Sequence, residues 1–455
     1  MRVLETWQTE RQDDSAVDHK EIHEIAHVRV LTGGVAQAVY VFNSKGTSVG
    51  RIGGDCELVV DDGRMSRKHA RIERSAAGWQ LQDLGARNRG FVDGRGYGAG
   101  ARVPLPDGAV VRLGDTVLVF RASPPTNDGE ADSPVFPGVS PIAVSVRRRI
   151  NALAPAAGHV LIVGETGAGK ERVAQAIGEQ RAPQPFVTLN SAQLSRELAR
   201  SELFGHVRGA FTNATANKAG LVDAAGGGVL FLDEIGELSL DVQAELLRFL
   251  EDGSYRPLGA TELRHSTARV VAATHVDLDE AVSTGRFRKD LLARLRASNT
   301  PLVLPPLRER REDILQWTEL FFRQRERELT SPPWTVGGLE CLLLFPWPYN
   351  LRELRATVAE ADEHGVRPCG TEHLPARLRE HRGALRKSTA AANDPTPTPP
   401  EPTQAEITEA LRETQGNVRL TAQRLNVDRR KLYRLCERFG IAYEEYRGEH
   451  QREDE

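Results

Sequence analysis

The spacing of apolar positions divides the chain into parts with different periodicities. Between residues 27 and 122, short apolar runs such as AVYVF and TVLVF alternate with turns rich in Gly and Asp, which predicts an all-β domain. Between 139 and 310, the apolar runs HVLIVG, PFVTLN, GVLFLDE and ARVVAAT alternate with helical stretches, which predicts an α/β domain with a parallel sheet. An apolar stripe at helical spacing predicts a helical subdomain at 311–385, and residues 404–443 predict helices joined by a tight turn.

Two segments between these parts have compositions typical of linkers. Residues 123–138 and 386–403 are rich in Pro, Ser, Thr and Asp and have few apolar positions. Such segments bury too little apolar surface to offset the entropy lost on ordering. An N-terminal extension at 1–26 and an acidic tail at 444–455 complete the predicted organisation.

The composition excludes several classes of protein. With 455 residues, of which 40% are hydrophobic and 27% charged, the chain is long enough for about three globular domains. No run of 18 uninterrupted apolar residues predicts a membrane span, and the N-terminus has no apolar signal-peptide core. The cysteines form no CxxC pair, so we expect neither a zinc site nor a disulfide framework, and we expect a cytoplasmic protein.

The net charge of −3 predicts no nucleic-acid partner, but the charge is unevenly distributed. The stretch DRRKLYRLCER, residues 428–438, holds five Arg or Lys residues against two acidic ones. This asymmetry is typical of a small DNA-binding module, and on charge alone a solvated helix face fits it equally well.

The stretch GETGAGK, residues 164–170, has the form of a phosphate-binding loop. It follows the apolar run HVLIV and opens a helical stretch, which is the strand–loop–helix order that a P-loop requires. Its glycines let backbone N–H groups surround phosphate oxygens, and Lys170 reaches the terminal phosphates. The strict pattern continues with Ser or Thr, whereas this chain has Glu171, so a glycine-rich turn beside an unrelated lysine also fits this motif alone. The candidate ATP-binding residues of this stretch are Gly164, Glu165, Thr166, Gly167, Ala168, Gly169, Lys170 and Glu171.

A second motif supports nucleotide hydrolysis. The run GGVLFLDE ends in Asp233 and Glu234, which a parallel strand would place near the P-loop. Asp233 is the candidate Mg²⁺ ligand, and Glu234 is the candidate residue that polarises the attacking water. An acidic strand end without function is the alternative.

Several longer stretches carry a resemblance to a known family. The stretches SELFGHVRGAFTNA, GGVLFLDEIGELSLDVQAELLRFLEDGSYRPLG, GRFRKDLLARL, LPPLRERREDI and WPYNLREL resemble the AAA+ domain of bacterial sigma-54-dependent transcriptional activators. The resemblance covers residues 139–385, with the motifs in order, and implies ATPase activity with Mg²⁺. A glutamate after the P-loop lysine is usual in that family.

The resemblance implies roles for residues outside the two nucleotide motifs. Arg288 and Arg294 match arginine fingers that act on the nucleotide of a neighbouring subunit, which implies a ring, expected to be a hexamer. Surface arginines on a basic helix are the alternative. Arg352 in WPYNLREL matches the sensor II arginine of the helical lid and is a further candidate ATP-binding residue. The candidate switch and sensor residues are Asn190, expected to pair with Glu234, and Thr274 and His275.

A small-residue loop interrupts the ATPase motifs. In the family, a GAFTGA loop contacts the sigma factor during the ATP cycle. Here the corresponding residues are Gly209, Ala210, Phe211, Thr212, Asn213 and Ala214, so Asn replaces the second Gly of the family motif. An exposed aromatic on a mobile loop is favourable only if a partner covers it, so we expect Phe211 to be exposed in the free protein.

The N-terminal part resembles a forkhead-associated (FHA) domain, a β-sandwich that binds phosphothreonine. The resemblance is carried by SVGRIGGDCELVVDDGRMSRKHARIE followed by LQDLGARNRGFVDG. The candidate phosphopeptide-binding residues are Arg51, Ser66, Arg67, Arg87 and Asn88. Charge-assisted hydrogen bonds from such donors stabilise a bound phosphate. A sandwich that serves only for packing or self-association is the alternative.

Two further residues of the FHA-like part are not candidates for phosphopeptide binding. His69 is expected to brace the Ser66 loop rather than to bind ligand, and Asp93 stands where Asn is common. The domain order suggests that a Ser/Thr kinase supplies the input, through a phosphothreonine protein or another copy of this chain.

The C-terminal part resembles the helix-turn-helix of the factor-for-inversion-stimulation (Fis) type that ends many such activators. The sequence ITEALRETQGNVRLTAQRLNVDRRKLYRLCERFGI carries this resemblance. The candidate DNA-binding residues lie at the start of the second helix: Arg429, Arg430, Lys431, Tyr433 and Arg434. Such a helix fits the major groove of enhancer DNA. A helix pair for packing or dimerisation is the alternative.

Together these parts predict a multidomain protein: an all-β FHA sandwich, an α/β AAA+ P-loop ATPase with a helical lid, and an all-α helix-turn-helix. The predicted function is an ATP-dependent activator that binds enhancer DNA and remodels the sigma-54 RNA polymerase holoenzyme. The alternative is an FHA-containing DNA-bound regulator whose AAA+ domain acts on another partner. A metabolic ATPase finds no support in the flanking domains.

Overall fold

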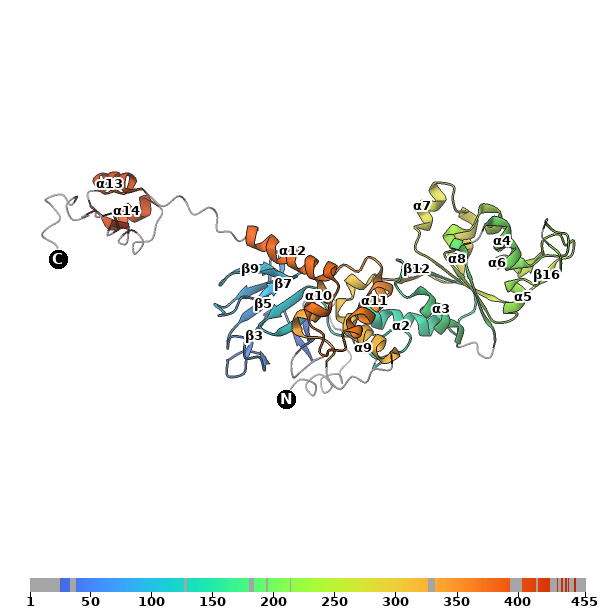
Figure 1. Cartoon of the computed structure of the whole chain (residues 1–455), viewed down its shortest axis with the longest axis horizontal. Coiled ribbons are helices and arrows are strands. Elements are labelled where there is room, and N and C mark those ends of the chain that lie inside the picture. The colour runs from blue at the N-terminus through green and yellow to red at the C-terminus, as the bar shows by residue number, and fades with distance from the viewer. Residues whose placement is uncertain are drawn as a thin grey trace, which may run out of the picture. The chain divides into compact units, whose positions relative to one another are not determined.

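The computed structural model divides the chain into two compact units, Met1–Ser388 and Thr389–Glu455 (Figure 1). The structure describes residues 25–32, 38–126, 129–179, 184–193, 195–212, 214–325, 332–392, 403–414 and 416–425, and the single residues 432, 435, 436, 438, 439, 441 and 446. The first unit holds a β-sandwich, an α/β domain and a helical subdomain, and the second unit holds short helices.

The sandwich consists of two sheets, with strand orders β2-β1-β11-β10-β7-β8 and β4-β3-β5-β6-β9. Its strands are β1 (Ala26–Val30), β2 (Val39–Phe42), β3 (Thr47–Arg51), β4 (Leu58–Val60), β5 (Ala70–Ser75), β6 (Gly78–Asp83), β7 (Phe91–Val92), β8 (Arg95–Gly96), β9 (Arg102–Pro104), β10 (Val110–Leu113) and β11 (Thr116–Arg121). All strand pairs are antiparallel except β3 with β4. The predicted all-β domain is therefore present.

Strand β11 is buried on both faces, which explains its nearly continuous apolar sequence. Leu118 and Phe120 point into the core of the sandwich. Val117 and Val119 point the other way and join a core shared with the helical subdomain. Because side chains alternate along a strand, the run TVLVFR supplies two separate cores at once.

The α/β domain has a five-stranded parallel sheet with the order β13-β14-β17-β12-β18. Its strands are β12 (Val160–Gly164), β13 (Phe186–Asn190), β14 (Val229–Asp233), β17 (Arg269–Thr274) and β18 (Leu302–Leu304). The first four correspond to the predicted apolar runs, and three-residue β18 is too short to show a period. Around the sheet lie α2 (Pro141–Leu153), α3 (Lys170–Glu179), η1 (Ser191–Gln193), α4 (Arg196–Phe204), α5 (Leu221–Ala225), η2 (Ile235–Glu237), α6 (Leu240–Asp252), the pair β15 (Ser254–Tyr255) and β16 (Arg264–His265), α7 (Leu278–Ser283) and α8 (Lys289–Ser298).

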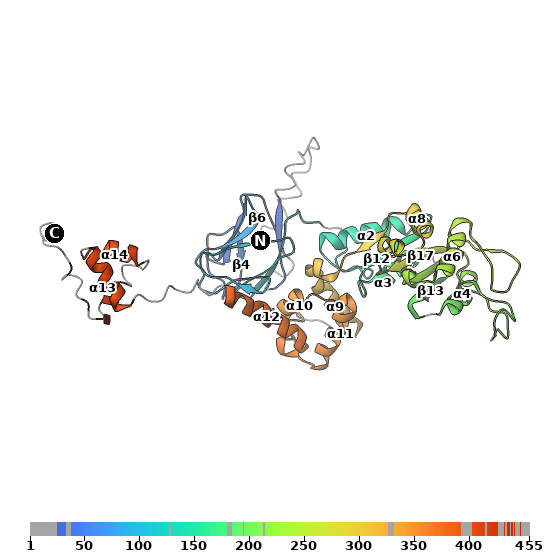
Figure 2. The ribbon, with the colours of Figure 1, turned by 90° about the horizontal axis from the view of Figure 1, so that it is seen from above.

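The helical subdomain packs around buried aromatic residues, among them Trp317 and Trp347. Its elements are η3 (Leu307–Glu309), η4 (Arg311–Asp313), α9 (Ile314–Gln324), α10 (Val336–Leu344), α11 (Asn350–Glu363), η5 (Thr371–His373) and α12 (Ala376–Ala392). Figure 2 shows α9, α10 and α11 gathered in one group. Helix α12 continues to Ala392, past the position 386 at which we predicted a linker to begin. No helix among the described residues has both the length and the apolar composition needed to cross a membrane.

The sandwich and the helical subdomain are in direct contact. Arg121 of β11 donates two hydrogen bonds to Glu312, Nε–Oε1 at 2.7 Å and Nη2–Oε2 at 2.6 Å, and both side chains are almost fully buried. Arg311 donates to Asp93 at 2.6 Å, which gives the aspartate at this Asn-preferring position a partner. Phe136 is fully buried in the shared core, so the end of the predicted linker 123–138 is packed rather than solvated.

The second unit contains α13 (Gln404–Glu413) and α14 (Val418–Arg424). Thr403 begins α13 with a capping box, in which its side chain and that of Glu406 bond each other's backbone N–H groups. Ile407, Leu411 and Ala422 form a small core with apolar residues of the segment that follows. The sequence predicted a tight turn between the helices of this part, and residues 426–431, which follow α14, lie outside the described residues.

Candidate nucleotide and phosphopeptide sites

The P-loop lies between β12 and α3, as the sequence predicted. Gly167 and Gly169 have φ angles of +76° and +108°, which residues with a Cβ rarely adopt. Lys170 is the first residue of α3, and its Nζ donates to the carbonyl oxygen of Gly164 at 2.9 Å. The loop therefore directs backbone N–H groups and one ammonium towards the carboxyl edge of the sheet, which is a suitable environment for an anion.

The acidic pair at the end of β14 faces the P-loop lysine. Lys170 Nζ lies 3.5 Å from a carboxylate oxygen of Glu234. The other oxygen of Glu234 lies 2.7 Å from His275 Nδ1 and accepts the backbone N–H of His275 at 3.2 Å. Glu234 has a φ of +55°, an uncommon conformation that turns the chain directly after the strand.

The pKa values of the two carboxyl groups, Asp233 and Glu234, are shifted in opposite directions. Burial and the neighbouring charge of Glu234 raise the pKa of Asp233. Burial acts in the same direction on Glu234, but hydrogen bonding from His275 and the charge of Lys170 outweigh it and lower its pKa. Different pKa values in adjacent acids suit different roles, and the lowered value keeps Glu234 ionised near neutral pH.

The candidate switch and sensor residues lie along the same edge. Thr274 ends β17, is fully buried and accepts the N–H of Val276 at 3.0 Å. Asn190 pairs in register with Asp233 across β13 and β14, but its side-chain oxygen accepts the N–H of Ala192 at 3.0 Å. In this part of the described structure His275, rather than Asn190, is the hydrogen-bond partner of Glu234. The pairing of Asn190 with Glu234 stays a prediction.

The start of α11 contacts the P-loop through a residue that the sequence analysis did not select. Asn350 is fully buried, donates to Glu165 Oε2 and to the carbonyl oxygen of Thr166 at 3.1 Å each, and accepts the N–H of Leu307 at 2.7 Å. The N–H of Leu351 donates to Gly167 O at 3.0 Å. A signal existed, because Asn350 lies within WPYNLREL.

The candidate sensor Arg352 follows directly on this turn. A Cβ placed on Gly167 would lie 3.2 Å from the Cβ of Arg352 and 2.3 Å from the carbonyl oxygen of Tyr349. Arg352 therefore lies against the P-loop. Tyr349 has a φ of −109°, a value that residues with a Cβ adopt readily, so this tyrosine brings no backbone strain to the turn.

Two arginines near the P-loop were also missed. Arg310 is completely buried, lies 4.4 Å from the ring centre of Phe136, and donates to Ala168 O at 3.2 Å. Arg308 pairs with Glu165 at 2.6 Å, and this hydrogen bond lowers the pKa of Glu165. Both lie in LPPLRERREDI, where the charge pattern resembles that of an ordinary exposed segment.

The candidate arginine fingers lie around α8, on contacts within their own subdomain. Arg288 precedes α8 and pairs with Asp290 at 2.7 Å, with its side chain 39% exposed. Arg294 donates to the carbonyl oxygens of Leu250 at 2.9 Å and Glu251 at 3.3 Å, at the end of α6. Their action on a neighbouring subunit stays a prediction.

The loop with the candidate sigma-54 contacts is folded back on its own base. Backbone pairing of His206 with Lys218 closes the base. Gly209 donates to Ala214 O at 2.8 Å, and the ring of Phe211 lies 4.9 Å from that of His206 in an edge-to-face arrangement. Phe211 is thus half-buried, whereas we expected it to be exposed; Thr212 is exposed. Ala210 packs near Gly259, and Asn213 lies outside the described residues.

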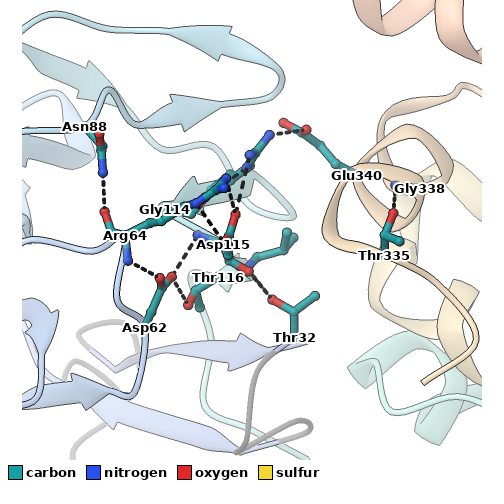
Figure 3. Close-up of polar contacts among 12 residues, drawn as sticks. Thr32, Asp62, Arg64, Asn88, Gly114, Asp115, Thr116, Thr335, Gly338 and Glu340 are labelled. Carbon is teal, nitrogen blue, oxygen red and sulfur yellow. Dashed lines mark hydrogen bonds and ion pairs between the residues drawn. The ribbon is translucent and has the colours of Figure 1, made fainter. Parts of the chain in front are cut away.

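The candidate phosphopeptide residues converge at one end of the sandwich. Ser66 Oγ accepts the N–H of Arg87 at 3.0 Å, and the carbonyl oxygen of Ser66 accepts the N–H of Arg51 at 3.0 Å. Asn88 donates to Arg64 O at 2.7 Å, so its amide braces the neighbouring loop (Figure 3). A Cβ on Gly50 would lie only 1.9 Å from the carbonyl oxygen of Arg67, so this glycine permits the close approach of the loops.

His69 lies beneath this loop, consistent with a bracing role. It is fully buried, and its Nδ1 accepts the N–H of Ser66 at 3.2 Å. Burial lowers the pKa of His69, so the ring stays neutral at physiological pH. The predicted DNA-binding residues Arg429, Arg430, Lys431, Tyr433 and Arg434 all lie outside the described residues.

Known proteins resemble the chain over the same parts. The family profile described as "Sigma-54 interaction domain" matches residues 137–300, and the profile described as "FHA domain" matches residues 47–114. The chain is 40% identical over 322 residues to "Anaerobic nitric oxide reductase transcription regulator NorR" of Citrobacter koseri, which covers 67% of this chain and 62% of that protein. It is 38% identical over 338 residues to "Regulatory protein LuxO" of Vibrio cholerae, with coverages of 68% and 62%.

A crystal structure of NtrX from Brucella abortus in complex with ATP is also similar, with 30% identity, a TM-score of 0.47 and coverage of 67% of this chain and 69% of that one. The chain spans about three fifths of the length of the NorR and LuxO relatives. The predicted family is confirmed: this chain belongs to the sigma-54-dependent transcriptional activators, with an FHA domain in addition to its AAA+ domain.

Proposed function

We propose that this chain is an ATP-driven activator that remodels the sigma-54 RNA polymerase holoenzyme while bound to enhancer DNA. The observation that carries the proposal is the position of the loop containing Phe211 and Thr212. The paired base of the loop leads into α5, and α5 leads into β14, which ends at Asp233 beside Glu234. A structural change at the nucleotide site could therefore reach the loop through β14 and α5 alone.

The residues at the carboxyl edge of the sheet fit ATP with Mg²⁺. The P-loop presents backbone donors and Lys170, and Asp233 offers a half-buried carboxylate, the hard oxygen ligand that Mg²⁺ prefers. Bound Mg²⁺ neutralises charge on the phosphates. Burial, together with the neighbouring charge of Glu234, raises the pKa of Asp233, and a bound cation would favour the ionised form of this carboxylate.

Hydrolysis needs a positioned, ionised carboxylate more than covalent chemistry. Glu234 meets this need because its pKa is lowered and His275 fixes its orientation at 2.7 Å. We assign Glu234 to orienting and polarising the attacking water. Thr274 and His275 would report the state of the nucleotide to β17, and Arg352 would do so for the lid.

The ring and the arginine fingers follow from the family. Arg288 is at the start of α8, and its exposed guanidinium is available to reach a neighbouring subunit once it leaves Asp290. A guanidinium is always charged and offers a rigid fork of donors to a phosphoryl group. We propose a hexamer that hydrolyses ATP only at assembled interfaces.

The end of the sandwich suits a phosphothreonine. Because Ser66 Oγ accepts the N–H of Arg87, its own hydroxyl proton remains available for a phosphate oxygen. Arg51, Arg67 and Arg87 add positive charge around that hydroxyl. We propose that a phosphothreonine protein regulates the activator here, and that Arg429, Arg430 and their neighbours bind DNA.

Trapping the complex with sigma-54 tests the proposal. We expect purified sigma-54 to bind the full chain in the presence of ADP and a metal fluoride, and Thr212→Ala to abolish the complex on a native gel. Thr215→Ala is the matched control, because Thr215 is an exposed threonine of the same loop. Failure to form a complex, with ATPase activity and assembly intact, would instead favour a DNA-bound regulator that acts on another partner.

A further inference from the structure

The AAA+ lid is attached to the FHA domain through a buried carboxylate. Glu340 of α10 has a side chain that is only 1% exposed. It accepts a hydrogen bond from Arg112 of the FHA strand β10 at 3.0 Å, and others from Arg382 and Arg386 of α12. Arg112 is therefore the cation by which the FHA domain holds a junction of two lid helices.

Arg112 also faces a carboxylate of its own domain. Asp115 lies 4.0 Å from Arg112 on one side and 3.3 Å from Arg64 on the other. Asp62 fixes the backbone of this turn, because its Oδ2 accepts the N–H of Asp115 and the hydroxyl of Thr116 at 2.8 Å each. Asp115 is thus placed between two arginines that compete for it.

Arg64 belongs to the loop that carries the phosphopeptide residues. It lies two positions before Ser66, its side chain is 71% exposed, and its carbonyl oxygen accepts the amide of Asn88. Figure 3 shows the resulting continuous series of contacts from Asn88 through Arg64 and Asp115 to Glu340. We call Arg64, Asp115, Arg112 and Glu340 the relay.

We propose that phosphopeptide binding to the FHA domain loosens its hold on the AAA+ lid through this relay; the proposal rests on the phosphothreonine function proposed above. A phosphate carries up to two negative charges, so it attracts Arg64 more strongly than the single charge of Asp115 does. Asp115, released from Arg64, then pairs more closely with Arg112. Because Arg112 is then shared between Asp115 and Glu340, it binds Glu340 less tightly. The carboxylate of Glu340 keeps its hydrogen bonds from Arg382 and Arg386, which belong to the lid itself.

The lid is the part of the chain through which such a change reaches the nucleotide. Asn350 and Leu351, at the start of α11, hydrogen-bond the P-loop. A restrained lid restricts movement of this turn, so its release favours closure around nucleotide. By linkage, nucleotide then strengthens phosphopeptide binding by the same factor.

The experiment measures both affinities on the full chain. The probes are a fluorescent phosphothreonine peptide chosen from a degenerate library, its unphosphorylated form, and the slowly hydrolysed analogue ATPγS with Mg²⁺. For the unaltered chain we expect ATPγS to tighten peptide binding about five- to tenfold, within the usual range of coupling between sites.

Two variants separate the steps of the relay. Arg112→Met keeps an unbranched side chain against the ring of Phe91 and removes the charge. It should raise affinity for ATPγS about five- to tenfold without peptide and abolish coupling. Asp115→Asn leaves the pair of Arg112 and Glu340 in place, so ATPγS affinity should stay unchanged while coupling is lost. Arg102→Met, at an exposed position of strand β9, is the matched control and should keep full coupling.

The outcomes distinguish the two proposals. If no phosphothreonine peptide binds, the phosphopeptide function itself is wrong, and the relay falls with it. If peptide binds with the same affinity with and without ATPγS, or if coupling persists in Arg112→Met and Asp115→Asn, only the relay is overturned.

Discussion

Glu234 is the residue whose chemistry the structure defines most sharply. Replacing it by Gln keeps its size but removes the charge that we propose orients the attacking water, so we expect ATP turnover to fall about 10²–10³-fold while nucleotide binding changes little. Steady-state hydrolysis and equilibrium binding of a fluorescent nucleotide measure the two quantities. Glu237→Gln, one turn further and exposed, is the matched control. Equal losses in both variants would contradict the assignment.

His159 gives the α/β domain a defined dependence on pH. Its Nδ1 accepts the N–H of Val270 at 3.1 Å, and burial, followed by the charges of Arg294 and Arg269, lowers its pKa from 6.5 to about 4. Between these values the unfolded chain binds a proton that the folded one does not. We therefore expect the contribution of His159 to stability to be complete above pH 6.5 and to decrease as the pH falls towards 4, by at most about 3 kcal/mol.

The variant His159→Asn tests this dependence. Asn offers an acceptor at a similar reach but does not titrate, so the thermal midpoint of the variant should fall less than that of the unaltered chain between pH 7 and pH 4.5. All other groups contribute equally to both proteins. Parallel curves would show that His159 is not responsible.

At the scale of single residues, the sequence identified the site residues that belong to a recognised motif. It did not identify residues whose role depends on a contact formed in the folded protein. Lys170 and Glu234 were predicted to meet, and they do. Asn350 and Arg310 acquire their roles only because the lid folds onto the P-loop, more than a hundred residues away along the chain. A contact between residues so far apart along the chain leaves no local sequence pattern. Asn350 and Arg310 could therefore have been selected only because they lie within longer family motifs.

The turn that begins α11 holds the lid on the P-loop. Asn350→Ala removes three hydrogen bonds, each worth about 1 kcal/mol, and places a residue less tolerant of a positive φ at +48°. We expect nucleotide affinity to fall at least about tenfold, measured by calorimetry. Asn350→Gly relieves the backbone strain but not the lost bonds, so it should recover only part of the affinity. Full recovery would show that the side chain itself contributes little.

At the scale of elements, the sequence predicted strands well where only one face of the strand is buried, because apolar and polar residues then alternate. Strand β11 departs from simple alternation because the FHA sandwich and the lid bury opposite faces of it. The predicted linker 123–138 has the composition of a solvated segment, yet Phe136 fills the lid core beneath Arg310. Both differences have the same cause. Each segment packs against the lid, and a contact between domains produces no regular spacing of apolar residues in the sequence.

At the scale of the molecule, the FHA and AAA+ domains form one packed body rather than two domains on a tether. The buried pair of Arg121 and Glu312 and the cluster around Glu340 each join the sandwich to the lid. Breaking a buried pair on one side leaves an uncompensated charge, so such contacts fix an orientation strongly. We therefore expect an input at the sandwich to reach the lid through these direct contacts.

The proposed ring makes a prediction that only mixed assemblies can test. Arg288→Ala subunits keep Glu234 but donate no finger, and Glu234→Gln subunits donate a finger but cannot orient water. If the finger acts on the neighbouring nucleotide, each variant alone is inactive, whereas a mixture forms interfaces that combine an intact Glu234 with an intact Arg288. We expect ATPase activity to rise to a maximum near equal proportions. The doubly substituted chain mixed with Arg288→Ala is the control and should restore nothing, because no subunit then offers Arg288. Activity confined to the level of the separate variants would mean that Arg288 acts within its own subunit or not at all.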